Sequence, residues 1–138
     1  MRLGYGIASE EIIGRLYGIK QPFNVNMAAQ IAAAASLDDE DFPKRVIENN
    51  TEGLSLYYKT LDELGLNYIR SHGNFIMFDT GIDSDIVVDY YLKKGILLRG
   101  GKEFGRPTWL RVTIGTSEEN QLVLEKLKEL ISKKYKRR

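Results

Sequence analysis

The residues of this sequence best suited to chemistry are three arginines that stand beside glycines or within apolar segments. Arg2 opens residues 3–8, a short, apolar segment punctuated by glycine, which we expect to be a buried strand. An arginine there needs an anionic partner, because an unpaired buried charge is costly. That partner is either a carboxylate of the protein or a phosphate-like group, to which the planar guanidinium is suited.

The other two arginines lie close together near the C-terminal end. Arg111 stands in the middle of a predicted strand of apolar and β-branched residues, 109–113. Arg99 follows the apolar residues 96–98 and precedes two glycines. The alternation of a strand allows Arg111 to face solvent, and Arg99 can be a surface charge at a strand end. Each of these two arginines can therefore be either a surface charge or part of an anion-binding site.

Three motifs together resemble a known family. They are Arg-Leu-Gly-Tyr-Gly at 2–6, Gln-Pro-Phe-Asn-Val-Asn at 21–26, and Arg-Val-Thr-Ile-Gly-Thr at 111–116. This combination resembles the C-terminal part of the fold-type-I pyridoxal-phosphate aminotransferases, and within them the histidinol-phosphate aminotransferases. The resemblance extends over almost the whole sequence, although the motif at 2–6 alone is shared by many enzymes of this fold type.

The resemblance implies a role for each arginine. Arg2 matches the arginine that helps to hold the phosphate of the cofactor, pyridoxal 5'-phosphate. Arg111 matches the arginine that grips the α-carboxylate of an amino-acid substrate, or another anionic group bound there. Arg99 matches one that helps to bind the substrate phosphate. The implied reaction moves the amino group of histidinol phosphate, or a related amine, to 2-oxoglutarate with formation of glutamate, in histidine biosynthesis.

The resemblance also implies that one essential residue lies elsewhere. In the family, the lysine that forms the Schiff base with the cofactor precedes the Arg-x-Gly-Tyr motif by a few residues, but here Met1 directly precedes Arg2. We therefore expect these 138 residues alone to have essentially no turnover and to contain no catalytic residue of their own.

Three hypotheses follow for how such a chain acts. It is part of a transaminase, as a homodimer or completed by the missing N-terminal part. Alternatively it is a non-catalytic module that uses Arg99 and Arg111 to bind an anionic metabolite or a partner chain. The third hypothesis is a purely structural scaffold.

Composition narrows the class of protein. Twenty basic and nineteen acidic residues give a net charge of +1, which provides no global field for nucleic acid or a membrane surface. The absence of cysteine excludes a disulfide framework and a thiolate metal site, and no apolar run approaches the ~20 residues that span a bilayer. His72 is the only histidine, so no metal site is expected. We expect a cytoplasmic protein.

The pattern of apolar residues predicts an α/β chain with an α+β C-terminal part. The resemblance implies that residues 1–65 are a remnant of a large cofactor-binding domain plus a long interdomain helix, and that 66–138 are a small C-terminal domain. The predicted strands are 3–8, 66–69, 74–78, 96–99 and 108–114. The predicted helices are 9–17, 27–37, 44–64, 82–94 and a last one opened by a capping box at 116–119.

Overall fold

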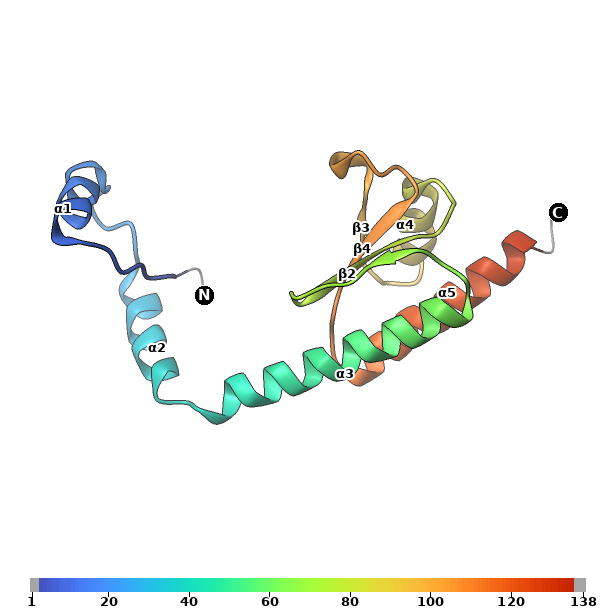
Figure 1. Ribbon diagram of the computed structural model, residues 1–138, viewed down its shortest axis with the longest axis horizontal. Coiled ribbons are helices and arrows are strands. Elements are labelled where there is room, and N and C mark those ends of the chain that lie inside the picture. Colours follow the sequence, from blue (N-terminus) through green and yellow to red (C-terminus); the bar gives the residue numbers. More distant parts are fainter. Residues whose placement is uncertain (1–2, 136–138) are drawn as a thin grey trace. The chain divides into compact units, whose positions relative to one another are not determined.

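The computed structural model describes residues 3–135, and the chain divides into two compact units, Met1–Lys44 and Arg45–Arg138 (Figure 1). Each unit is described by itself. The first contains two short helices, and the second contains a four-stranded sheet with helices on one face.

The first unit consists of α1 (Glu10–Ile19) and α2 (Met27–Leu37) with extended chain around them. Both helices begin at a polar cap. The Ser9 hydroxyl accepts a hydrogen bond from the Ile12 N–H at 3.5 Å, and the Asn26 Oδ1 accepts one from the Ala29 N–H at 2.7 Å. These side chains satisfy backbone donors that have no partner inside the helix.

The strand predicted at 3–8 is absent: the structure has no regular secondary structure there. A strand forms only where another strand accepts its backbone hydrogen bonds, and the described part of this unit offers none. The expected burial of the segment is also not seen, since Ile7 is 91% exposed.

The second unit is built on an antiparallel sheet of strand order β1-β2-β4-β3. The strands are β1 (Tyr68–Ile69), β2 (Phe75–Asp79), β3 (Arg99–Gly100) and β4 (Trp109–Thr113). The helices are α3 (Asp41–Glu63), which begins in the first unit, α4 (Ser84–Leu92) and α5 (Ser117–Tyr135), with a short 3₁₀ helix η1 (Lys102–Phe104). The order β-β-α-β-β-α predicted from residue 66 onward is present, although β3 is shorter than expected.

The two central strands separate a buried face of the sheet from an open one. Burial alternates along β2 and β4, as the pleat of a strand requires. The inward side chains pack with residues of α3, α4 and α5 into one core. Its fully buried members include Tyr57, Leu61, Ile76, Phe78, Val87, Tyr91, Leu110 and Leu127. The outward side chains, Arg111 among them, are half-buried or exposed.

A glycine sets how closely α3 approaches the end of β4. A Cβ atom placed on Gly53 would lie 2.4 Å from the Ile114 Cγ2 and 2.9 Å from the Asn120 side chain. From sequence, Gly53 is only a weak point in the helix, because glycine has a low helix propensity. The packing supplies the reason for it, and α3 and α5 lie side by side with β4 ending between them (Figure 1).

Replacing Gly53 with alanine should destabilise the second unit by about 1–3 kcal/mol, since overpacking a close contact outweighs the gain in helix propensity. Urea unfolding followed by circular dichroism measures the change. Ser55→Ala, on the exposed side of the same helix, should change the free energy of unfolding by less than about 0.5 kcal/mol. A Gly53→Ala variant as stable as the parent would show that Ile114 can move aside.

The first unit should open far more readily than the second. No residue of α1 is buried and only Ala29 is buried in α2, whereas Phe23, Tyr5 and Ile19 are 99%, 85% and 80% exposed. We expect self-association or early proteolysis there, because few buried contacts mean low local stability. Limited proteolysis should cleave within residues 10–37 before it cleaves in α5. Simultaneous cleavage of both regions in a monodisperse monomer would contradict this.

Candidate anion-binding site on the open sheet face

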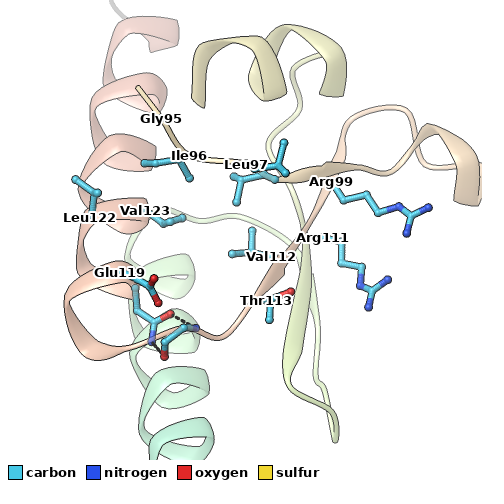
Figure 2. A pocket seen from close by; sticks show the side chains of 13 residues that line it. Gly95, Ile96, Leu97, Arg99, Arg111, Val112, Thr113, Glu119, Leu122 and Val123 are labelled. Atoms are coloured by element: carbon cyan, nitrogen blue, oxygen red, sulfur yellow. Dashed lines mark hydrogen bonds between the residues drawn. The ribbon is translucent and has the colours of Figure 1, made fainter. Parts of the chain in front are cut away.

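Arg99 and Arg111 are directly opposite each other on neighbouring strands. They are register partners in the β3–β4 pair, which places their Cβ atoms about 5 Å apart on the same face. Figure 2 shows both side chains extending in the same direction, away from the apolar residues that face α5. The structure therefore brings together two of the three arginines singled out from the sequence, and their charges repel unless an anion lies between or above them.

Arg111 is held in place by an aromatic ring of the next strand. Its guanidinium carbon lies 4.2 Å from the centre of the Phe75 ring on β2, and the residue is half-buried. Among residues 3–135, no carboxylate forms an ion pair with it. The flat face of the guanidinium is thus occupied, while its N–H donors remain able to bind a carboxylate or phosphate in the bidentate way that arginine favours.

Arg99 already forms an ion pair, but the pair is exposed and weak. Its Nη2 lies 2.7 Å from the Glu103 Oε2, and its guanidinium carbon lies 5.5 Å from the Phe104 ring centre. The side chains of Arg99 and Glu103 are 58% and 69% exposed, so solvent screens the pair and it contributes little to stability. An incoming anion can therefore compete with Glu103 for this arginine.

Two further residues belong to the same face and were missed from the sequence. Trp109 is two residues before Arg111 on β4, and the guanidinium of Arg106 lies 4.5 Å from its ring centre. The period of two along β4 could have placed Trp109 beside Arg111. Arg106 lies in the loop before β4, where no periodicity indicates the direction of a side chain.

Lys102, by contrast, is not available to an anion. Its Nζ lies 2.5 Å from the Asp85 Oδ2 and 3.0 Å from the Asp83 Oδ1. The hydrogen bonds that Lys102 donates to Asp85 and to Asp83 raise the pKa of Lys102, and accepting the bond from Lys102 lowers the pKa of Asp83. The cluster holds one lysine and two aspartates, so the charge of Lys102 is already balanced, and it lies at the N-terminal end of α4.

A groove adjoins the arginine pair where β3 begins. It has a volume of about 850 Å³ and lies between residues 95–98, the end of β4 and the first turns of α5 (Figure 2). Arg99 and Arg111 line one margin of it, and Ile96, Leu122 and Val123 line the apolar interior.

The turn from β4 into α5 is fixed by two sets of hydrogen bonds. The predicted capping box is present: the Thr116 N–H donates to the Glu119 Oε2 at 2.8 Å, and the Glu119 N–H donates to the Thr116 Oγ1 at 3.3 Å. The buried Asn120 accepts from the Gly115 N–H at 3.0 Å and donates to the Gly115 carbonyl at 3.1 Å. The Asn49 side chain of α3 donates to the same carbonyl at 2.9 Å. The strand that carries Arg111 is thereby tied to both helices.

Arg2 lies outside the described residues, and the chain beside it does not form a site for pyridoxal phosphate. A Cβ atom on Gly4 or Gly6 would have nothing within 4 Å, so no cradle surrounds this segment. The groove that Leu3, Ile7 and Phe23 line carries one cation, Lys20, which lies over the Tyr17 ring. Residues 3–44 by themselves do not fit a phosphorylated cofactor.

Neither a metal site nor a membrane-spanning helix is found among the described residues. Histidine and acidic side chains form no cluster able to hold a metal ion within 3–135. No helix in that range is long and apolar enough to cross a membrane.

Comparison with known proteins identifies the family. Residues 1–127 match the model of the aminotransferases of class I and II. The chain is 40% identical over 134 residues to a histidinol-phosphate aminotransferase of Geobacillus sp. (strain WCH70). The aligned region covers 97% of this chain and 37% of the relative. The chain therefore belongs to the class I and II aminotransferase family, which depends on pyridoxal phosphate.

Solved structures agree on the fold. The putative histidinol-phosphate aminotransferase of Erwinia carotovora atroseptica matches with a TM-score of 0.80 and 25% identity, over 94% of this chain and 37% of that one. The enzyme of Sinorhizobium meliloti, solved in complex with pyridoxal-5'-phosphate, matches with a TM-score of 0.74 and 24% identity, over 86% and 34%. The chain has the fold of the C-terminal portion of a fold-type-I aminotransferase, and spans little more than a third of the length of these relatives.

Titration with inorganic phosphate should reveal the arginine pair as a site. Replacing Arg111 with glutamine should weaken binding about tenfold or more, because it removes the charged donors. Phe75→Leu should weaken it about two- to fivefold, the size expected for a lost cation–π contact. The chemical shifts of the arginine Nε–H groups in ¹H–¹⁵N spectra follow the titration.

The matched control is Arg70→Gln, which removes an arginine that lies 5.1 Å from the Tyr58 ring centre and is not one of Arg99, Arg106 and Arg111. That variant should bind phosphate as the parent does. Equal weakening by Arg70→Gln and Arg111→Gln would mean that phosphate responds to overall charge and not to this site.

Proposed function

We propose that this chain is the substrate-binding part of an aminotransferase that transfers the amino group of histidinol phosphate, or of a related amine, to 2-oxoglutarate. The observation that carries the proposal is the Arg111 side chain, half-buried on Phe75 and without a carboxylate partner among residues 3–135. The 40% identity to a histidinol-phosphate aminotransferase supports the choice of substrate.

In this function Arg111 binds the α-carboxylate of glutamate, or the anionic group of the amine that occupies the same place in the other half of the reaction. Two parallel N–H···O bonds fix the orientation of the substrate as well as its position. The Phe75 ring prevents the guanidinium from turning, so the donors point in one direction before the substrate arrives.

Arg99 binds the phosphate of the amine substrate in this proposal. Because its pair with Glu103 is exposed, a phosphate with two negative charges can displace the carboxylate at little cost. Because Arg99 and Arg111 are register partners on neighbouring strands, both of their positive charges can face one doubly charged substrate.

The remaining parts of the enzyme come from polypeptide that these 138 residues do not include. Arg2 contributes to holding the cofactor phosphate, together with groups from the rest of the polypeptide. Pyridoxal phosphate supplies the electron sink of the reaction when bound. The working enzyme is a homodimer, and this chain alone has no turnover.

A binding module without catalysis is the second candidate. It is favoured by the fact that the second unit has its own core, on which Arg99 and Arg111 are presented without the first unit. Such a module would bind an anionic metabolite or partner chain through the same two arginines.

A chimera distinguishes the two candidates. Residues 1–138 replace the matching C-terminal part of the Geobacillus enzyme, and transamination between histidinol phosphate and 2-oxoglutarate is measured. The chimera should be active, and Arg111→Lys should lower kcat/KM about 10²-fold or more, because a bidentate charged contact is lost.

The control substitution is Arg70→Lys, which should leave kcat/KM within about twofold. A folded chimera that binds pyridoxal phosphate but does not transaminate histidinol phosphate would contradict the proposed substrate. Phosphate binding by the unmodified chain, without activity of the chimera, would support the binding module instead.

A further inference from the structure

The loop between β3 and β4 folds back over the open face of the sheet at Gly101. The Gly101 N–H donates to the Trp109 carbonyl at 2.8 Å, so the register that pairs Arg99 with Arg111 continues to this glycine. A side chain at position 101 would therefore point to the same face as Trp109. Its Cβ atom would collide with the Arg106 carbonyl and lie 2.9 Å from the Trp109 Cβ. The missing side chain leaves the room in which residue 106 crosses this face.

Three contacts fix Arg106 above Trp109. The Arg106 N–H donates to the Gly101 carbonyl at 3.0 Å, and the Trp109 N–H donates to the Arg106 carbonyl at 3.1 Å. The guanidinium carbon of Arg106 lies 4.5 Å from the centre of the Trp109 ring. The residue is exposed, but its backbone is bonded on both sides and its charge has a defined place on the open face.

This place is close to the arginine pair already described. Trp109 and Arg111 are two residues apart on the same face of β4, a separation of about 7 Å. Arg99 lies across from Arg111 on β3, at the start of the loop that Arg106 ends. The Arg106 guanidinium is therefore about one two-residue repeat along the strand from the pair formed by Arg99 and Arg111.

The charge of Arg106 has no acidic partner in ion-pair contact within residues 3–135. In the same loop, Glu103 pairs with Arg99, and Lys102 pairs with two aspartates at the start of α4. Asp79, on the β2 side of β4, accepts a backbone N–H bond at 2.8 Å. The ring of Trp109 orients the guanidinium of Arg106 without cancelling its charge, so its N–H donors can bind an anion.

We propose that Arg106 determines specificity by binding the anionic group of the substrate that lies remote from the reacting carbon. Arg106 and Arg99 together form a pair of cations for this distal group, while Arg111 binds the other end. The distal group is the phosphate of the amine in one half of the reaction and the second carboxylate of 2-oxoglutarate in the other. This inference deepens the proposed function, on which the identity of the two substrates rests.

A second cation makes the distal position sensitive to the charge of its ligand. Coulomb energy is proportional to the product of the two charges, so a cation contributes about twice as much free energy to a dianion as to a monoanion. A phosphate monoester carries nearly two negative charges at neutral pH and above. A carboxylate that displaces Glu103 from Arg99 exchanges one charge for an equal one, whereas a phosphate brings a second charge that Arg106 can bind.

Two small probes test the proposal on the 138-residue chain. Methyl phosphate is doubly charged at pH 8, and acetate is singly charged. Their affinities are measured at constant ionic strength from the arginine Nε–H signals in ¹H–¹⁵N spectra. Arg106→Gln should weaken the binding of methyl phosphate about tenfold and that of acetate about threefold, because the two losses of free energy should differ about twofold.

Two further substitutions locate the effect. The matched control is Arg70→Gln, which also removes an exposed arginine that lies over an aromatic ring, that of Tyr58, and should change neither affinity more than about twofold. Trp109→Leu should weaken methyl phosphate about two- to fivefold, because it removes the ring that orients Arg106. Combined with Arg106→Gln it should add little, since both changes remove the same interaction. Urea unfolding of each variant checks that the chain remains folded.

Kinetics of the Geobacillus chimera give an independent readout. Arg106→Gln should raise the KM for histidinol phosphate about tenfold and the KM for 2-oxoglutarate about threefold. The kcat should stay within about twofold, because a group remote from the reacting carbon contributes similarly in the ground state and the transition state.

Three results would overturn the inference. The first is that Arg106→Gln leaves the affinity for methyl phosphate unchanged. The second is that it weakens methyl phosphate and acetate by the same factor. The third is that Arg70→Gln weakens methyl phosphate as much as Arg106→Gln does, which would mean that overall charge is responsible.

The outcome is separable from that of the proposed function. An active chimera whose KM values do not respond to Arg106→Gln would overturn the role of Arg106 and leave the aminotransferase proposal intact. Selective weakening of methyl phosphate in the 138-residue chain, together with an inactive chimera, would support the pair of cations and contradict the proposed substrate.

Discussion

The antiparallel pairing of β2 with β4 is the constraint on which the rest of the second unit depends. Five residue pairs join the two strands, from Phe75 with Thr113 to Asp79 with Trp109. Because successive side chains of a strand point to opposite faces, this register sends Leu110 and Val112 into the core and leaves Arg111 outside. A shift of one residue would bury the arginine and expose the core residues, so the helices that cover the inner face also determine where the cation lies.

The open face concentrates positive charge that the described residues neutralise only in part. Arg99, Arg106 and Arg111 each lie over an aromatic ring, and Arg99 alone of the three has a carboxylate within ion-pair distance among residues 3–135. Rings orient the guanidinium groups without cancelling their charge. This face of the sheet is therefore suited to receive an anion.

Much of the second unit could be predicted from sequence because its signals are local. The capping box at Thr116, the periodicity of α5 and the order of strands and helices from residue 66 each depend on residues close in the chain. The opposition of Arg99 and Arg111 could not be read in this way, since it depends on the register of two strands that an irregular loop connects. The role of Gly53 could not be predicted either, because its cause is the side chain of Ile114, 61 residues further along the chain.

The first unit shows where prediction from local sequence fails. Residues 3–8 have the composition of a strand, yet the described residues of that unit contain no strand to pair with them. The apolar composition of a segment indicates that it is stable when buried, and the surface that buries it can belong to other polypeptide. The 37% coverage of the Geobacillus relative agrees with this interpretation.

The hydrogen bonds around Gly115 bear on the thermodynamics of binding at Arg111, four residues earlier. Asn49 and Asn120 tie the end of β4 to two helices, and Phe75 packs against the guanidinium itself. Backbone and side chain are therefore immobilised before any ligand arrives, and that conformational entropy is already lost on folding. Association with an anion should consequently carry a small entropic penalty from the protein, so that most of the contact energy appears as affinity.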